Sequence, residues 1–315
     1  MHQSVQDAFP AFTEPLEGRV PFMYLDVKGL VTTGVGNLID ADDPTHLFSN
    51  ANLVPEAFGF DWRDRNTDAQ AGQAEIQAEY TTVKNRQDLK NAPTGTKETI
   101  TQLRLTDQAI DQMVATRIAS NETVLKQTAE FASLDGWPAD AQLGLFSMAW
   151  AMGAAFAQGG RWPNFRAAVG AQDWASAAAN SKMDDAGNAG LRPRNARNAL
   201  LFTIASFVVA NGGDVTQLVY DASLSLEDNM RSGNFAVPLN LVIGVQTALE
   251  KLGFDPNGLD GGIGAGTRTA LTNFQAANNL TQTPNAQTIA DIGADTIAAL
   301  GAQLDALQPP VAHVP

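Results

Sequence analysis

Three side chains near the start of the sequence have the types and spacing for acid–base chemistry. Glu17 precedes Asp26 by nine positions, and Thr32 follows Asp26 by six. Cleavage of a glycosidic bond needs a protonated carboxyl that gives a proton to the leaving oxygen, and an ionised carboxylate that positions water or supports the positive sugar. Two acids and a hydroxyl that converge in the fold could supply both. The spacing alone leaves open a second interpretation, two solvated surface acids.

The residues that follow Glu17 predict the element that would position the other two side chains. Residues 22–25 (FMYL) are apolar and aromatic, a Lys-Gly pair supplies a turn, and residues 30–33 (LVTT) are rich in β-branched side chains. This pattern predicts a β-hairpin that carries Asp26 and Thr32. Two glycines after the hairpin allow close approach of the backbone.

The segment 17–38 (EGRVPFMYLDVKGLVTTGVGNL) resembles the active-site signature of phage-type lysozymes, which reads EG, then YxD, then a G-hxT-xGxGxL hairpin. Every spacing of that signature is kept. The resemblance covers about residues 10–47 and 105–207, where it includes a long linking helix, a buried helix, and late WxxAA and GL-R-A elements. It implies a β-1,4-N-acetylmuramidase of lysozyme-like fold.

The resemblance also implies a role for each of the three side chains. Glu17 would be the general acid, Asp26 would hold the attacking water or stabilise the positive sugar, and Thr32 would orient that water. The bond cleaved would be the β-1,4 bond between N-acetylmuramic acid and N-acetylglucosamine. A carboxyl separation of roughly 5–5.5 Å favours a retaining route and roughly 6.5–9.5 Å an inverting route, and the resemblance favours inversion.

Three further residues are expected to contact the substrate. Asn37 stands where many members of the family carry a histidine, a position that supports the site. Arg194 could bridge to the acid or to the lactyl carboxylate of the sugar, although a structural or solvated role is an equal alternative. Trp62 belongs to an aromatic stretch (FGFDW, residues 58–62) that could line a groove, since sugar rings present apolar faces to aromatic side chains.

Apolar periodicity predicts that most of the chain is helical. Ile110, Met113, Val114 and Ile118 recur on one face of an amphipathic helix, and residues 141–155 (AQLGLFSMAWAMGAA) are apolar all round, as in a helix enclosed by others. The expected fold class is mainly α: an α+β lysozyme-like domain with a small β-hairpin lobe, plus a small all-α domain.

The C-terminal part resembles a second family. Residues 245–275 contain the elements of an LQxxLxxLG helix and a DGxFGxxTxxAVxxFQ helix-loop-helix, and residues 290–300 form a weaker second repeat. This pattern is similar to that of peptidoglycan-binding domains. The Gly, Asp and Thr residues of the repeated turns are expected to hold the fold rather than to touch the ligand.

The two resemblances and the breaks in composition predict the domain organisation. We expect a muramidase domain at residues 1–231, a linker at 232–239, a peptidoglycan-binding domain at 240–303 and a tail at 304–315. The polar stretch at about 48–104 would be an insertion in the first domain, with a helix around residues 69–83. A surface insertion is favoured there over a binding role.

The composition of the 315 residues excludes several function classes. Twenty Lys and Arg stand against 34 Asp and Glu, a net charge of −14, so nucleic acid would be repelled. The chain has no cysteine, and its three histidines form no zinc motif. We therefore expect no metal, no cofactor and no nucleic-acid partner. A monomer is expected.

The sequence also bears on where the protein acts. No run of 18 apolar residues occurs, and residues 1–15 lack a signal-peptide pattern. We expect no membrane insertion and a protein that is cytoplasmic before release and acts in the periplasm or cell wall of a target bacterium. It would be a phage endolysin or an effector injected by a secretion machine. Its expected partner is bacterial peptidoglycan, and an immunity or delivery protein is a further candidate.

Two other functions stay open at this point. A lytic transglycosylase needs the acid but no water-positioning carboxylate, and leaves a 1,6-anhydro product, so Asp26 and Thr32 favour hydrolysis. A catalytically inactive wall-binding protein would have no particular reason to keep Glu17, Asp26 and Thr32 together.

Overall fold

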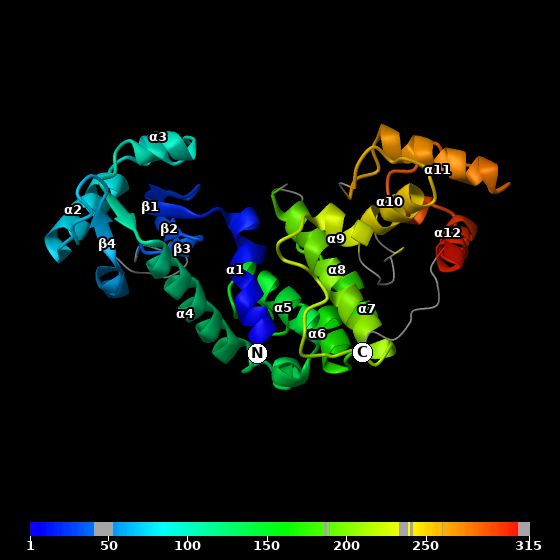
Figure 1. Ribbon diagram of the computed structural model, residues 1–315, viewed down its shortest axis with the longest axis horizontal. Coiled ribbons are helices and arrows are strands. Elements are labelled where there is room, and N and C mark those ends of the chain that lie inside the picture. The colour runs from blue at the N-terminus through cyan, green and yellow to red at the C-terminus, as the bar shows by residue number, and fades with distance from the viewer. Residues whose placement is uncertain are drawn as a thin grey trace. The chain divides into compact units, whose positions relative to one another are not determined.

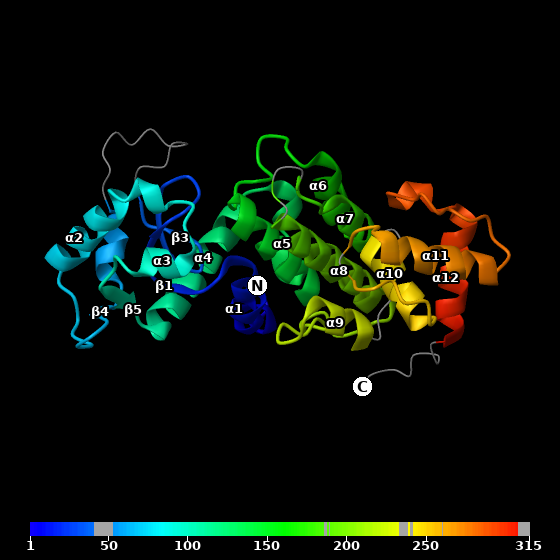
Figure 2. The ribbon, with the colours of Figure 1, turned by 90° about the horizontal axis from the view of Figure 1, so that it is seen from above.

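The computed structural model describes residues 1–40, 53–185, 188, 190–232, 239, 242–259 and 261–307. Helices dominate these residues and strands are few, which confirms the mainly α fold class (Figures 1 and 2). The chain divides into two compact units, one of residues 10–120 and one of residues 1–9 with 121–315. The division passes through helices α1 (Gln3–Glu17) and α4 (Asp107–Leu125), and so falls inside the domain predicted at 1–231.

The predicted hairpin is confirmed in the unit of residues 10–120. Its strands form one antiparallel sheet in chain order: β1 (Val20–Leu25), β2 (Val31–Gly34) and β3 (Asn37–Leu38). The register places Tyr24 opposite Thr32, and the backbone N–H of Asp26 donates to the Leu30 carbonyl at 2.9 Å. Gly29 closes this turn with φ of +82°, a conformation that favours glycine.

The long helix α4 supplies an apolar stripe to the same unit. The four side chains whose spacing predicted an amphipathic helix are each at most 5% exposed, which confirms the prediction: Ile110, Met113, Val114 and Ile118. No helix in the described ranges is long and apolar enough to cross a membrane.

The described part of the predicted insertion, residues 53–104, is a folded part of this unit. Its elements are η1 (Pro55–Gly59), β4 (Trp62–Asp64), α2 (Gln73–Lys84), η2 (Gln87–Leu89), α3 (Thr94–Glu98) and β5 (Leu103–Leu105). The helix expected around residues 69–83 is confirmed by α2. Strands β4 and β5 pair with each other, which periodicity did not predict.

A buried carboxylate joins the insertion to the hairpin. Asp40 is 2% exposed and accepts hydrogen bonds from the Tyr80 hydroxyl (3.0 Å), the Lys84 ammonium (2.6 Å) and the backbone N–H of Val31 (3.0 Å). Tyr80 and Lys84 of α2 bond to the same carboxylate as the backbone N–H of Val31 in β2. This shared carboxylate therefore fixes α2 against β2. The insertion therefore helps to hold the strand that carries Thr32.

The other unit contains a bundle built around the helix that is apolar all round. Helix α5 (Ala139–Met152) is buried from residue 139 to residue 150, as its composition predicted. It packs on α8 (Leu191–Ala210), which also contacts α7 (Trp174–Asn180). The remaining elements of this bundle are η3 (Ala129–Phe131), η4 (Leu134–Gly136), α6 (Pro163–Gly170) and α9 (Leu226–Ser232).

The C-terminal helices form their own small core. They are α10 (Val242–Lys251), α11 (Ala265–Ala277) and α12 (Ala294–Leu307), with the short η5 (Ile289–Asp291) before the last helix (Figure 1). The apolar core contains Leu249, Leu271, Phe274 and Leu300, each with no exposed surface.

Two buried glutamines hold the two turns of this module in the same way. Gln246 donates from Nε2 to Thr267 Oγ1 (3.0 Å) and accepts from the N–H of Gly261 at Oε1 (2.9 Å). Gln275 donates to Thr296 Oγ1 (3.1 Å) and accepts from the N–H of Thr283 (2.8 Å). The threonines therefore hold the fold, as the repeat pattern predicted.

The boundaries of the module differ from the prediction at one end. Helix α12 continues to Leu307, and Leu304 is 5% exposed within the core, so the predicted tail at 304–315 begins too early. Residues 308–315, like most of the predicted linker at 232–239, lie outside the described residues. Leu239 packs against the core and belongs to the module.

Asp140 in α5 makes the stability of the bundle depend on pH. Its carboxylate is fully buried and accepts N–H bonds from Val219 (3.2 Å) and Tyr220 (2.9 Å). Burial raises the pKa of Asp140 from 3.8 to about 6, against the opposing effect of these hydrogen bonds. Between these two values the folded state binds a proton that the unfolded chain has released, so this group adds stability as the pH falls.

We expect the free energy of unfolding of the wild type to rise between pH 7 and pH 4 by about 2 kcal/mol more than that of Asp140→Asn. The variant keeps the size of the side chain but cannot titrate, so the contributions of all other groups cancel in the comparison. Denaturant unfolding of both proteins at the two pH values measures the difference. The same pH dependence in both would mean that Asp140 titrates alike in the folded and unfolded states.

Candidate active site

The three side chains selected from the sequence lie on adjoining elements of one unit. Glu17 is the last residue of α1, Asp26 begins the turn after β1, and Thr32 is in β2. Paired residues of an antiparallel sheet point to the same face, so Thr32 lies on the face of its partner Tyr24. Asp26 follows β1 directly, two residues after Tyr24, and its Oδ1 is turned toward the N–H groups of its own turn.

Tyr24 relates the two carboxylates to one side chain. Burial, together with the smaller effects of the negative charges of Glu17 and Asp26, raises the pKa of Tyr24 to about 12. Both charges therefore act on one phenol group. The sequence analysis did not select this tyrosine.

The Glu17 carboxylate packs against the backbone of Gly36. A Cβ atom at Gly36 would lie 3.2 Å from Glu17 Oε2, and Gly36 has φ of +66°, so both space and conformation favour glycine there. The Gly36 carbonyl accepts a hydrogen bond from Arg117 Nη1 at 2.9 Å. The turn beside Glu17 is thus fixed by a cation on α4.

Asp26 is held by the backbone of its own turn. One oxygen, Oδ1, accepts N–H bonds from Lys28 (2.8 Å) and Leu30 (2.9 Å). These bonds fix the orientation of the carboxylate. Within the described residues its other oxygen, Oδ2, accepts no hydrogen bond from protein, so it is available to a water molecule or a ligand.

Lys97 of the insertion places a positive charge near Asp26 and Tyr24. Its ammonium donates to the Leu25 carbonyl (2.8 Å) and lies 5.5 Å from the centre of the Tyr24 ring. Burial lowers the pKa of Lys97, and the nearby negative charge of Asp26 opposes that shift. Sequence reasoning missed Lys97, because nothing local relates it to a hairpin about 70 residues earlier.

Thr32 is almost completely buried, with 5% of its surface exposed. Its hydroxyl donates to the Leu30 carbonyl over 3.4 Å, a long hydrogen bond. Such a weak contact can be exchanged for a better one.

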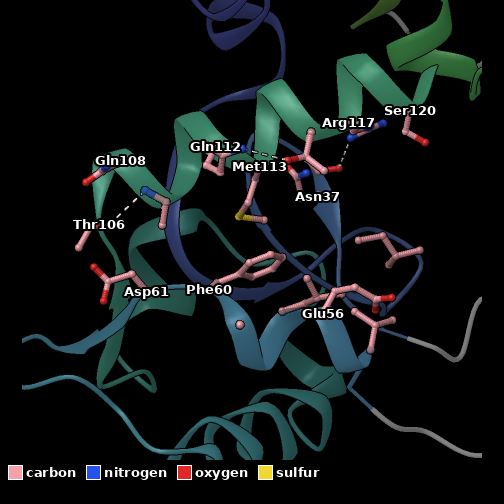
Figure 3. Close-up of a pocket in the computed structure, with 17 residues that line it drawn as sticks. Asn37, Glu56, Phe60, Asp61, Thr106, Gln108, Gln112, Met113, Arg117 and Ser120 are labelled. Carbon is pink, nitrogen blue, oxygen red and sulfur yellow. Dashed lines mark hydrogen bonds between the residues drawn. The ribbon is translucent and has the colours of Figure 1, made fainter. Parts of the chain in front are cut away.

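Asn37 lies at a cavity of about 770 Å³ in the same unit (Figure 3). Residues from η1 to Asp61, from α4 and from the segment around β3 line this cavity. The side-chain oxygen of Asn37 is buried and has no hydrogen-bond partner among the described residues. Asn37 thus lines the cavity while its side-chain oxygen is turned away from solvent.

The prediction that Trp62 contacts the substrate is wrong. The indole of Trp62 has no exposed surface, and its Nε1 donates to the Ala57 carbonyl at 2.9 Å. It is a core residue of the insertion. From the same aromatic stretch it is Phe60 that lines the cavity instead.

Arg194 is buried within the helical bundle. It is 3% exposed, and its Nη1 donates to the backbone carbonyl (3.1 Å) and the hydroxyl (3.2 Å) of Ser147. These bonds join α8 to α5. A contact between Arg194 and the acid or the sugar stays a prediction.

Comparison with known proteins identifies one part of the chain. Residues 239–300 match a family model described as a putative peptidoglycan binding domain. No curated protein matches the chain. The matched range coincides with the small core of α10, α11 and α12 and includes Leu239. Residues 239–300 thus resemble a peptidoglycan-binding domain, which supports peptidoglycan as a partner and a cell-wall-associated protein.

Proposed function

We propose that this protein is a muramidase that cleaves the β-1,4 bond between N-acetylmuramic acid and N-acetylglucosamine. The observation that carries the proposal is the convergence of Glu17 and Asp26 on Tyr24. Glycosidases use two carboxyl groups on either side of the scissile bond. The peptidoglycan-binding domain at residues 239–300 supports the choice of polymer, because it would keep the same chain on its substrate.

In the proposed mechanism Glu17 gives its proton to the leaving oxygen. This requires a carboxyl that is protonated at the working pH, while the second carboxyl stays ionised. Asp26 fits the second role, since Oδ1 is anchored by two N–H groups and Oδ2 is available to water. Thr32 would orient that water from the adjacent strand.

The two acids have different described surroundings. The negative charge of Asp26 opposes the lowering of the Lys97 pKa by burial, so this cation lies near Asp26. The Glu17 carboxylate lies against the Gly36 turn. We propose that the reaction takes place in the cell wall or periplasm of a target bacterium, where the polymer is found.

We expect Asp26→Asn to lower the rate of peptidoglycan hydrolysis by about 10²–10⁴-fold. The amide keeps an oxygen that accepts the N–H bonds of Lys28 and Leu30, so the turn should be retained while the negative charge is lost. New reducing ends released from purified peptidoglycan measure the rate. The exposed Asp305→Asn is the matched control and should act as the wild type does.

Full hydrolytic activity in Asp26→Asn would contradict a water-positioning carboxylate. Cleavage that continues without new reducing ends would instead indicate a transglycosylase, which needs only the acid.

A further inference from the structure

Two side chains of the insertion bond to the turn that carries Asp26. This turn connects β1 to β2, and within it the Gly29 N–H donates to the Asp26 carbonyl at 3.0 Å. The carbonyls of Leu25 and Gly29 flank Asp26 on either side. They accept hydrogen bonds from residues that lie 72 and 58 positions away in the chain, respectively.

Lys97 of α3 makes the first of these contacts. Its ammonium donates to the carbonyls of Leu25 (2.8 Å) and Lys90 (3.0 Å), so it joins the end of β1 to the segment after η2. Helix α3 packs on β1, and the ammonium lies 5.5 Å from the centre of the Tyr24 ring. Because the donor is charged, the bond to Leu25 is stronger than one from a neutral amide.

Gln87 of η2 makes the second contact. Its Nε2 donates to the carbonyls of Gly29 (3.1 Å) and Lys84 (2.9 Å), so it joins the turn to the end of α2. The amide lies so close to Gly29 that a Cβ atom there would collide with Gln87 Oε1. Gln87 is exposed and its donor is neutral, so this contact is the weaker of the two.

The two contacts bear on the direction of the Asp26 carboxylate. Its Oδ1 accepts N–H bonds from Lys28 and Leu30, which belong to the same turn, so the carboxylate follows the path of the turn backbone. A turn held at both flanking carbonyls samples fewer backbone conformations than a free one. Such placement matters for catalysis, since a misplacement of about 1 Å can lower a rate about 10²-fold.

We propose that Lys97 and Gln87 are positioning residues for Asp26, so that the insertion sets the geometry of the proposed second carboxylate. The inference rests on the proposed function, because it takes Asp26 as part of the reaction. Neither side chain is assigned a contact with the substrate. Helix α2 of the same insertion bonds to Asp40, so the insertion fixes both the turn and the strand that follows it.

The first test is the rate at which the full chain hydrolyses soluble glycan fragments. Lys97→Met and Gln87→Met keep the length of the side chain and remove its N–H donors. We expect kcat to fall about tenfold in Lys97→Met and about threefold in Gln87→Met, with KM within about twofold of the wild-type value. Lys97→Arg restores a charged donor and should recover most of the lost rate.

Matched controls make the same replacements at exposed positions. Lys182→Met removes one positive charge from the helical bundle, and Gln73→Met replaces an exposed glutamine at the start of α2. Both should hydrolyse the fragments as the wild type does.

Hydrogen exchange of the backbone tests the same inference without catalysis. The N–H groups of Lys28 and Leu30 both bond to Asp26 Oδ1, so a looser turn opens these bonds more often. We expect both amides to exchange about tenfold faster in Lys97→Met than in the wild type. Amides of the buried α5 should exchange at the wild-type rate, which shows that the fold is intact.

Either a wild-type kcat or wild-type exchange of the two turn amides in Lys97→Met would overturn the proposal. An equal loss of rate in Lys182→Met, or a rise in KM without a fall in kcat, would do the same. Cleavage by the wild type with unchanged kcat in both variants would keep the proposed function and lose the positioning role. A wild type that releases no reducing ends would lose the proposed function, and exchange alone would then decide whether the insertion holds the Asp26 turn.

Discussion

Replacing Glu17 with glutamine is expected to lower the rate of peptidoglycan cleavage by about 10²–10⁴-fold. The amide has nearly the shape of the carboxyl but cannot give up a proton, so departure of the sugar oxygen loses its acid. Packing against Gly36 should persist, because the substitution adds no heavy atoms to this close contact. Clearing of a peptidoglycan suspension over time measures the rate.

Two controls separate loss of chemistry from loss of fold in Glu17→Gln. The exposed Asp305→Asn changes the net charge by the same amount and should clear the suspension at the wild-type rate. Circular dichroism and sedimentation with insoluble wall should show that Glu17→Gln is folded and still bound. Undiminished clearing by this variant would exclude Glu17 as the general acid.

Removing the residues after Ser232 is expected to weaken retention on insoluble peptidoglycan by about 10²–10⁴-fold. The lost part contains the whole domain matched at 239–300. Tethering raises the local concentration of the proposed active site on an insoluble polymer, but it does nothing for a dissolved glycan fragment. Turnover of soluble fragments should therefore change much less than sedimentation with the wall. Equal losses in both assays would contradict a tethering role.

A substitution in the full chain gives the same comparison without truncation. Gln246→Ala removes the side chain that bonds Thr267 and Gly261, and so releases the first turn of the module. Unpaired buried groups would be left behind, which should unfold this small domain. Wall binding should fall as in the truncated chain, with turnover of soluble fragments preserved.

The hairpin and the placement of Glu17, Asp26 and Thr32 could be predicted because they depend on local sequence. A turn of fixed length sets the register of the two strands, and the register decides which residues share a face. The spacing from Asp26 to Thr32 therefore indicates the strand register that the structure shows. The buried α5 was equally predictable from a composition that is apolar all round.

The contribution of the insertion could not be predicted, because it depends on contacts between distant residues. Lys97 reaches Leu25, and the Tyr80 hydroxyl reaches Asp40, over separations of 72 and 40 residues. No periodicity in a polar segment encodes which side chain finds which partner. Helix α2 could be expected from its sequence, but its fixed position against β2 could not.

Trp62 and Arg194 show why residue type alone does not assign a side chain to the substrate. An aromatic ring suits a sugar and suits a core equally well, and sequence alone did not distinguish Trp62 from Phe60 two positions earlier. A guanidinium suits a substrate carboxylate, but it also satisfies buried oxygens such as those of Ser147. Residue type indicates which contacts a side chain can make, and burial decides which of them it makes.

The central claim is that Glu17 acts as the acid of a hydrolytic muramidase, and the chemistry of the product ends tests it most directly. Purified peptidoglycan is digested with the wild type and with Glu17→Gln, reduced with borohydride, and its soluble fragments are identified by mass spectrometry. The account predicts reduced muramic-acid ends from the wild type and none from the variant. Anhydro-muramic ends, reduced glucosamine ends, or muramic-acid ends that persist in Glu17→Gln would contradict it.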